Sequence, residues 1–445
     1  MTDTSSSASP NGFRRKRPWW IPFFLGGVPA LEPRLLSLLG FVSLALFFEG
    51  YDVSMLTSAL KFIAEDLAME EERLGFYTGL IRLGALPAIL IVPLADWLGR
   101  RRVFLGSVVG FSVCTCLTAF AMDTAQFVIA QMVCRMFMIA ATATSVAIIT
   151  EEFPAQHRGW AIGIMGALAA CGHGLGAGLF AAIEYLPYGW RTLYFIGLLP
   201  LSLLGRLRGG VTETSRFHQR RKAVLAQSGP DSPPSPLSSW GRPLLWLFSA
   251  YPARTLGLTL AALMSALGVA SAFQFSGYYL LTVHGWSPGQ YSLMVMTAGA
   301  FGIVGNVVAG RLGDSWGRRR VGTLFLLTFP IAAWLFYSGG SITLPLAWAM
   351  IVFSFTACDV VLKSMATELF PTSYRGTAAG WLAFTQTLGW AGGLWLHSLV
   401  VADLGGMGSA AVLLSLFCMV GVAPLLALPE TRRRELEDIS PEPVS

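Results

Sequence analysis

Long apolar segments recur along the whole chain, and they constrain its fold more than any other feature. Twelve of them come close to the roughly 20 residues that an α-helix needs to cross the hydrocarbon core of a bilayer. Because the sequence is 54% apolar and only 13% charged, one soluble core of 445 residues could not bury it. We therefore predict an all-α membrane protein with twelve transmembrane helices. The expected helices are 36–60, 74–95, 103–122, 126–149, 160–183, 190–206, 254–281, 289–311, 320–338, 343–366, 376–399 and 405–428.

These helices are expected to form two bundles of six, because a polar stretch separates the sixth helix from the seventh. That stretch contains SGPDSPPSPLSS, a composition typical of a linker or of a loosely folded cytoplasmic segment. The predicted parts, in chain order, are a cytoplasmic N-terminal tail (1–35), a six-helix bundle (36–206), a cytoplasmic central loop (207–253), a second six-helix bundle (254–428) and a cytoplasmic C-terminal tail (429–445).

The basic residues predict the orientation of the helices. Arg73 and Arg191 lie on one side of the expected membrane, whereas most of the 31 lysines and arginines lie in the tails and loops of the other side. Loops rich in Lys and Arg remain in the cytoplasm, so we expect both termini there and the protein in the inner (plasma) membrane. The net charge of +6 comes from these short loops, and no nucleic-acid partner is expected. The six cysteines lie in apolar segments without metal-ligand spacing, so no metal or cofactor is expected.

Two motifs occur once in each half, at almost the same separation. LADWLGRRRV at 94–103 returns as LGDSWGRRRV at 312–321, which places Asp96 and Asp314 218 residues apart. EEFPAQHRGWAIG at 151–163 returns as ELFPTSYRGTAAG at 368–380, which places Glu151 and Glu368 217 residues apart. The agreement indicates duplicated halves, and the equal helix numbers relate them by an axis along the membrane normal.

With two six-helix halves and these paired motifs, the chain resembles the major facilitator superfamily over about residues 36–435. It is similar to the sugar-porter and metabolite–proton symporter branches, because Gly50-Tyr51-Asp52 lies in helix 1, ETSRF follows helix 6 at 213–217 and PETR follows helix 12 at 429–432. The resemblance implies that both motifs help to set the conformation at the cytoplasmic side, with Asp96 and its arginines bridging to the opposite half. The implied gating residues are Asp96, Gly99, Arg100, Arg101, Glu151, Arg158, Asp314, Gly317, Arg318, Arg319, Glu368 and Arg375.

The chain departs from these relatives in helix 7 and in the first loop motif. Sugar porters carry a pair of glutamines in helix 7, where Gly268 and Val269 stand here, and an asparagine where Gln274 stands. The missing pair disfavours a hexose substrate. In the first loop motif Val92 occupies the position of the glycine that the second copy has at Gly310, and we expect the first copy to pack less closely.

Ionisable side chains inside a membrane span cost about 2.5–3.5 kcal/mol each at mid-helix, so the few present here point to function. The resemblance implies that Asp52 in helix 1 and Arg135 in helix 4 couple transport to protons; a static buried ion pair is the alternative. The nearby Arg135 charge would hold the carboxylate ionised, and loss of that contact would favour its protonated form. Glu49 lies on the same helix face as Asp52 and either shares the proton or faces the outer vestibule.

Other polar and aromatic residues of the spans are candidates for the substrate site. Asp359 and Lys363 are spaced i, i+4 and either neutralise each other or contact the substrate. We expect Arg82 either to pair with Glu49 or Asp52 or to bind a substrate carboxylate. The candidate substrate-binding residues are Arg82, Gln274, Tyr278, Asp359, Lys363, Gln386 and Trp390.

We expect a secondary active transporter that moves a small organic solute, either an organic acid or a sugar-like metabolite, by alternating access as a proton symporter. A proton-coupled efflux antiporter for drugs or metabolites is the alternative, although Ala177 replaces the proline of the helix 5 antiporter motif. A non-transporting receptor on the same scaffold is a third hypothesis. No catalytic or nucleotide-binding motif is visible, so an enzyme is not expected. The expected partners are a small-molecule substrate, H⁺ and the lipid bilayer, with the protein functional as a monomer.

Overall fold

The computed structural model describes residues 18, 20–21, 28–29, 31–92, 94–202, 205, 209, 211, 213 and 241–432. Within these ranges the chain forms helices and connecting turns and no strand. Most of the expected N-terminal tail, most of the central loop at 207–253 and the end of the C-terminal tail lie outside them. The last part of that loop forms a helix, α13 (Gly241–Ala250), and the Pro/Ser-rich run lies outside the described residues.

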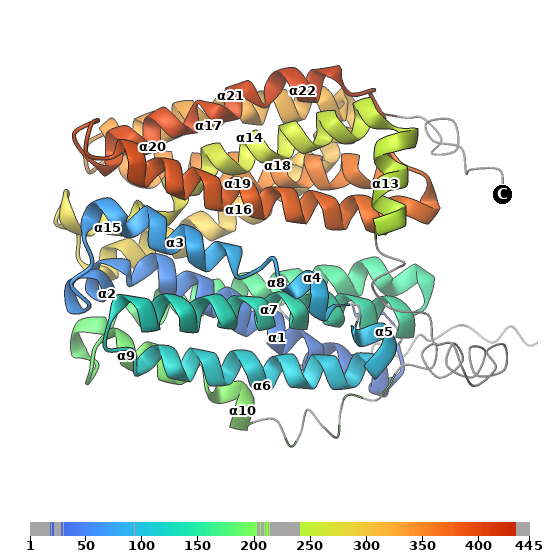
Figure 1. Cartoon of the computed structure of the whole chain (residues 1–445), viewed down its shortest axis with the longest axis horizontal. Helices are drawn as coiled ribbons and strands as arrows, with labels where there is room; N and C mark the ends of the chain where they lie inside the picture. The colour runs from blue at the N-terminus through green and yellow to red at the C-terminus, as the bar shows by residue number, and fades with distance from the viewer. Residues whose placement is uncertain are drawn as a thin grey trace, which may run out of the picture.

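The described helices form two bundles that lie side by side (Figure 1). The first bundle contains α1 (Pro33–Ser58), α2 (Leu60–Asp66), α3 (Leu74–Leu83), α4 (Ala88–Ile91), α5 (Leu94–Leu98), α6 (Arg100–Ala119), α7 (Thr124–Glu152), α8 (Ala155–Phe180), α9 (Trp190–Ile196) and α10 (Leu199–Ser202). After α13, the second contains α14 (Pro252–Gln274), α15 (Ser276–Thr282), α16 (Pro288–Trp316), α17 (Arg318–Ser338), α18 (Leu344–Glu368), α19 (Arg375–Val400), α20 (Met407–Ser415), α21 (Phe417–Val420) and α22 (Val422–Ala427).

These bounds correspond to the twelve expected spans. Among the described residues, nine helical segments are long and apolar enough to cross a membrane. The second and sixth expected spans are interrupted, as α3–α5 and α9–α10, because glycine and proline occur inside them at Gly84, Pro87 and Gly197. The eleventh span is α19, which is long enough to cross a membrane but is not among these nine segments because it is less apolar.

The two bundles repeat one packing pattern. In the first half α1 packs on α8, α6 on α7 and α3 on α7, and in the second half α14 packs on α19, α17 on α18 and α16 on α18. These pairs are the first with the fifth, third with the fourth and second with the fourth helix of each half. The packing therefore supports the duplication that the motif spacing predicts.

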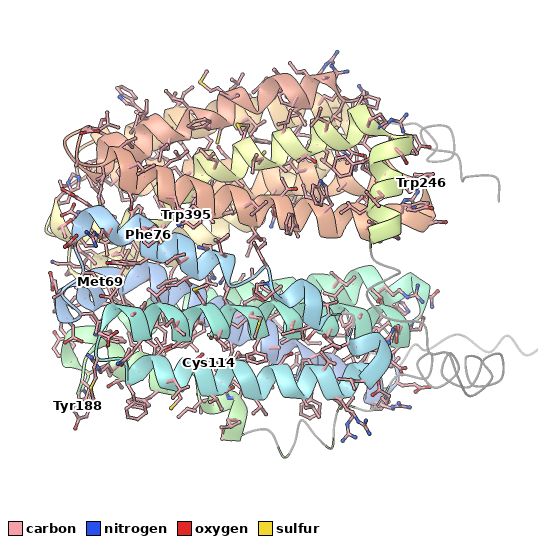
Figure 2. The ribbon with its side chains drawn as sticks, in the orientation of Figure 1. Met69, Phe76, Cys114, Tyr188, Trp246 and Trp395 are labelled. Carbon is pink, nitrogen blue, oxygen red and sulfur yellow. The ribbon has the colours of Figure 1, made fainter. Side chains whose placement is uncertain are left out.

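The two halves meet where α3 packs on α19, α8 on α16 and α2 on α15. There the backbone N–H of Phe76 donates a hydrogen bond to Ser398 Oγ at 2.8 Å, and Trp395 Nε1 donates one to the carbonyl oxygen of Phe76 at 3.3 Å (Figure 2). Lys61 Nζ donates to the carbonyl oxygen of Leu281 at 3.3 Å. These contacts hold the halves together at the end of the molecule that carries α2 and α15, which we call the closed end.

Candidate functional site

A cluster of charged side chains lies inside the first bundle. Glu49 and Asp52 come from α1, Arg82 from α3 and Arg135 from α7. Glu49 accepts a hydrogen bond from Thr142 Oγ1 at 2.5 Å, and it lies close enough to both arginines to interact with their charges. We call these four residues the charge cluster; two carboxylates and two guanidinium groups balance when all are ionised.

Asp52 occupies the more enclosed position of the two carboxylates. Its side chain is only 4% exposed, and Oδ1 is buried without a hydrogen-bond partner among the described residues. Asp52 interacts with Arg135 through its charge and lies beside Gln131, but no ion pair joins Asp52 to Arg135 in the described structure. The direct pair that the family resemblance implies is therefore absent in this conformation, and the coupling role of both residues stays a prediction.

The charge cluster is only partly covered by the surrounding helices. Glu49, Arg82 and Arg135 are half-buried, and His173 on α8 is exposed although it interacts with the charges of both arginines. The cluster is therefore not sealed inside the first bundle.

Arg82 links the cluster to the second half of the protein. Its Nη2 donates a hydrogen bond to Gln274 Oε1 on α14 at 3.3 Å, and its guanidinium lies 4.5 Å from the ring centre of Trp390 on α19. Arg82 Nε and Gln274 Nε2 are buried without a hydrogen-bond partner among the described residues. Three of the candidate substrate-binding residues, from three helices, thus meet at one point.

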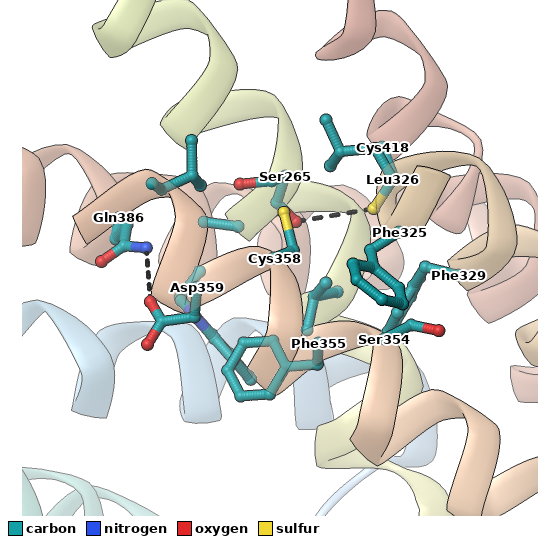
Figure 3. A pocket seen from close by; sticks show the side chains of 14 residues that line it. Ser265, Phe325, Leu326, Phe329, Ser354, Phe355, Cys358, Asp359, Gln386 and Cys418 are labelled. Carbon is teal, nitrogen blue, oxygen red and sulfur yellow. Dashed lines mark hydrogen bonds between the residues drawn. The ribbon is translucent and has the colours of Figure 1, made fainter. Parts of the chain in front are cut away.

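Asp359 and Gln386 lie in a pocket of the second bundle that Trp390 also lines (Figure 3). Gln386 Nε2 donates a hydrogen bond to Asp359 Oδ1 at 3.1 Å, and Lys363 Nζ lies 2.6 Å from Asp359 Oδ2. Lys363 itself is 64% exposed and lies outside the pocket lining. Of the two readings that the i, i+4 spacing left open, the structure shows the internal ion pair.

Tyr278 lies apart from the other candidate substrate-binding residues. It belongs to α15 at the closed end, and its charged neighbours are Glu65 and Glu71. The structure does not bring it to Arg82, Gln274 and Trp390, because the helix that carries Gln274 ends there and α15 continues toward the closed end.

The two repeated motifs meet within each half. Arg100 Nη2 lies 2.9 Å from Glu151 Oε1, and Arg318 Nη2 lies 3.0 Å from Glu368 Oε1. Arg318 also pairs with Asp314 at 2.8 Å. The side chain of Asp96 lies outside the described residues. The described ion pairs of both motifs thus lie inside each half, and the bridge from Asp96 to the opposite half stays a prediction.

The corresponding arginines of the second repeated motif, Arg158 and Arg375, differ in their contacts. Arg158 Nε donates to the carbonyl oxygen of Phe153 at 2.9 Å, whereas Arg375 Nε is buried without a hydrogen-bond partner in the described structure. Gly310 has open space beside it, since an added Cβ would meet no atom within 4 Å. The contrast between Gly310 and Val92 therefore has no packing consequence in this conformation.

Two glutamates of the family motifs that follow helices 6 and 12, which the sequence analysis did not count among the gating residues, complete these networks. Glu213 Oε1 accepts from the backbone N–H of Arg101 at 3.3 Å, and Glu430 accepts from the backbone N–H groups of Arg318 and Arg319 at 2.9 and 3.2 Å. Each carboxylate caps the positive end of a helix. Glu213 and Glu430 are 217 residues apart, the same separation as between Glu151 and Glu368. A search for glutamates repeated at this separation would have identified both.

The glycines of the loop motif make room for these carboxylates. Gly99 and Gly317 have φ of 104° and 106°, values that favour glycine. A Cβ would lie 2.2 Å from Glu213 Oε2 at Gly99, and 2.6 Å from Glu430 Oε2 at Gly317. Both properties explain why the motif contains glycine at this point.

Comparisons with known proteins agree with this architecture. The chain is 26% identical over 372 residues to a gallate transporter of Pseudomonas putida, covering 76% of this chain and 79% of the relative. It is 22% identical over 426 residues to a benzoate transport protein of Acinetobacter baylyi, covering 90% of each. Its fold matches the crystal structure of a D-xylose–proton symporter with a TM-score of 0.73 at 17% identity, covering 90% of this chain and 99% of that one.

The family model described as the Major Facilitator Superfamily matches residues 42–278 and again 258–443. The first match covers the first bundle and α14, and the second covers the second bundle. The helices, the family and the relatives together identify a multi-pass membrane protein that transports a solute. The chain belongs to the major facilitator superfamily.

Proposed function

We propose that the protein is a proton-coupled symporter that carries a small organic anion across the inner (plasma) membrane by alternating access. The observation that carries this proposal is the charge cluster. With Glu49 and Asp52 ionised, their charges balance those of Arg82 and Arg135. When one carboxylate takes up a proton, the cluster gains one net positive charge in a medium where charge is expensive. An anionic substrate then restores the balance, so proton and anion favour each other's binding.

We assign the transported proton to Asp52. An ionised carboxylate is costly to bury when an oxygen has no hydrogen-bond donor, and Asp52 Oδ1 is in that position. Glu49 has Thr142 as a donor and is better suited to remain ionised. The names of the relatives support an organic acid as substrate, since gallate and benzoate are both carboxylates.

We further propose that the closed end faces the cell exterior, which makes this conformation inward-facing. The closed end carries Glu65, Asp66 and the acidic run 70–72, whereas the opposite end carries the arginine runs 100–102 and 318–320. Because basic loops stay in the cytoplasm, both termini would be cytoplasmic. The site is built from the two halves of one chain, which supports a functional monomer in the lipid bilayer.

Transport in proteoliposomes tests the proposal, with gallate as the carboxylate. An inward proton gradient should drive uptake above the level of protein-free vesicles, because protons and anion enter together. Asp52→Asn should abolish this accumulation and retain exchange of external for internal gallate, since exchange needs no net proton movement. Accumulation by Asp52→Asn equal to wild type would refute the coupling role, and efflux driven by an inward proton gradient would support the antiporter instead.

A further inference from the structure

Arg82 and Gln274 each stand at the end of a helix that breaks inside the molecule. α3 ends at Leu83, directly after Arg82, where Gly84 packs so closely on α7 that a Cβ would lie 2.3 Å from the Met132 carbonyl oxygen. α14 ends at Gln274 itself, and α15 continues after Phe275. Interrupted helices place free polar groups in the middle of a transporter, where substrates bind.

The polar atoms at this junction lack an acceptor. The guanidinium of Arg82 donates to Gln274 at 3.3 Å, but Arg82 Nε and Gln274 Nε2 have no acceptor among the described residues. Both are N–H donors, and leaving buried donors unpaired costs free energy. A carboxylate offers about four acceptor positions and matches the planar fork of arginine. An anion with two oxygens would therefore supply acceptors to both unpaired donors.

Aromatic rings adjoin these donors on the side of the second bundle. Trp390 lies under the guanidinium of Arg82, and the ring centres of Phe273 and Phe355 lie 6.3 and 6.2 Å from that of Trp390. Phe273 and Phe355 are themselves 4.8 Å apart. The three rings are all half-buried and are tilted against one another at interplanar angles of 55°, 62° and 84°, so they form an apolar wall against which a neighbouring ring can pack.

We propose that Arg82, Gln274 and Trp390 form a binding subsite for an aromatic carboxylate, with the carboxylate on Arg82 and Gln274 and the ring against Trp390. This proposal rests on the proposed function and adds the substrate class and the residues that select it. Because Arg82 belongs to the first half and its two partners to the second, a ligand held here touches both halves. Binding of the substrate is therefore linked to the relative position of the two halves.

Calorimetric binding of three matched compounds to the purified protein tests the subsite. Benzoate has both the ring and the carboxylate, benzamide lacks the charge, and cyclohexanecarboxylate lacks the aromatic ring. Wild type should bind benzoate most tightly. Arg82→Gln should weaken benzoate about 10- to 100-fold, the loss expected for a charge-assisted hydrogen bond, and should leave benzamide nearly unchanged. Arg82→Lys should retain part of the preference for the charged compound.

Trp390→Leu should weaken benzoate about 2- to 10-fold relative to cyclohexanecarboxylate, because only the ring contact is lost. Arg191→Gln is the matched control: Arg191 lies 4.4 Å from the ring centre of Trp190 at the closed end, so this variant removes an arginine stacked on a tryptophan away from the subsite. It should leave the binding of all three compounds unchanged. Thermal unfolding of each variant shows whether it is folded.

Two results would overturn the subsite. One is a folded Arg82→Gln protein that still prefers benzoate to benzamide as wild type does. The other is a wild-type protein that binds cyclohexanecarboxylate as tightly as benzoate, or binds benzoate not at all at millimolar concentration. The proposed function fails separately, when wild type shows no proton-driven uptake of any carboxylate. Uptake of an aliphatic carboxylate without benzoate binding would reject the subsite alone.

Discussion

The carboxylate of Glu430 lies against the first turn of α17, where its Oε1 accepts a hydrogen bond from the backbone N–H of Arg318 at 2.9 Å. Glu430 follows the last helix of the second half, so the end of that half is tied back to the start of its third helix. Glu368 connects the same network to α18, because it accepts hydrogen bonds from Arg318 and, at 2.5 Å, from Thr431 Oγ1. Each link is internal to the second half.

Glu430→Ala should lower the stability of the protein by about 1 kcal/mol, the usual loss for a helix cap reinforced by the helix dipole. Glu430→Gln should lose less, because the amide oxygen still accepts a hydrogen bond. Thermal unfolding in detergent measures both. Glu184→Ala is the control, since Glu184 is exposed at the closed end. Equal unfolding temperatures for wild type and Glu430→Ala would contradict the capping role.

The ion pair between Arg100 and Glu151 should be strongly coupled. Arg100 is only 7% exposed, so Glu151→Ala leaves a buried charge and should destabilise the protein by about 3–5 kcal/mol. Arg100→Ala combined with Glu151→Ala should cost less than the sum of the single changes. A double-mutant cycle of unfolding free energies measures this difference, and additive effects would show that the two side chains act independently.

Gly79→Ala should shift the protein away from the present conformation. A Cβ at Gly79 would lie 2.5 Å from Trp395 Cδ1 across the contact of α3 with α19, so the closed end must separate to accept it. Spin labels at the exposed positions Glu72 and Asp403, one in each half, should report longer distances in the variant. Gly392→Ala on α19 is the control, because a Cβ there meets no atom within 4 Å. Identical distance distributions in both variants would reject this role of Gly79.

Anion binding should weaken as the pH rises. At low pH a protonated carboxylate leaves the charge cluster with a net positive charge, and at high pH both carboxylates are ionised and cancel the two arginines. In Asp52→Asn the position stays neutral at every pH, so the cluster stays positive and carboxylate binding should become nearly independent of pH. Calorimetric titrations with benzoate across pH 5 to about 8 measure this dependence. An unchanged pH dependence in Asp52→Asn would show that a group other than Asp52 takes up the proton.

Sequence periodicity and motif spacing predicted most of the fold. The twelve spans, the duplication and the basic end of the molecule follow from local composition, and a repeated motif needs no knowledge of tertiary contacts. The interruption of the second span after Arg82 was missed, although Gly84 and Pro87 are visible in the sequence. Length and hydropathy alone do not distinguish a broken helix from a continuous one.

The candidate site was predicted as a set of residues but not as an arrangement. Arg82 was expected to meet Glu49, Asp52 or a substrate, and its contacts with Gln274 and Trp390 depend on how two separate halves pack. No pattern within one half contains that information. The pairs of Arg100 with Glu151 and of Arg318 with Glu368 were likewise not predicted, although all four residues were named as gating residues.

The hydrogen bonds between the halves at the closed end affect the balance between the conformations of the transporter. The ion pairs of Arg100 with Glu151 and of Arg318 with Glu368 each lie within one half, so a movement of one half against the other can leave these pairs intact. The balance then depends on the few groups that cross between halves, such as Phe76 with Ser398. A change of about 1.4 kcal/mol alters such a ratio tenfold. Loss of one of these hydrogen bonds would therefore shift the ratio between conformations by up to about tenfold.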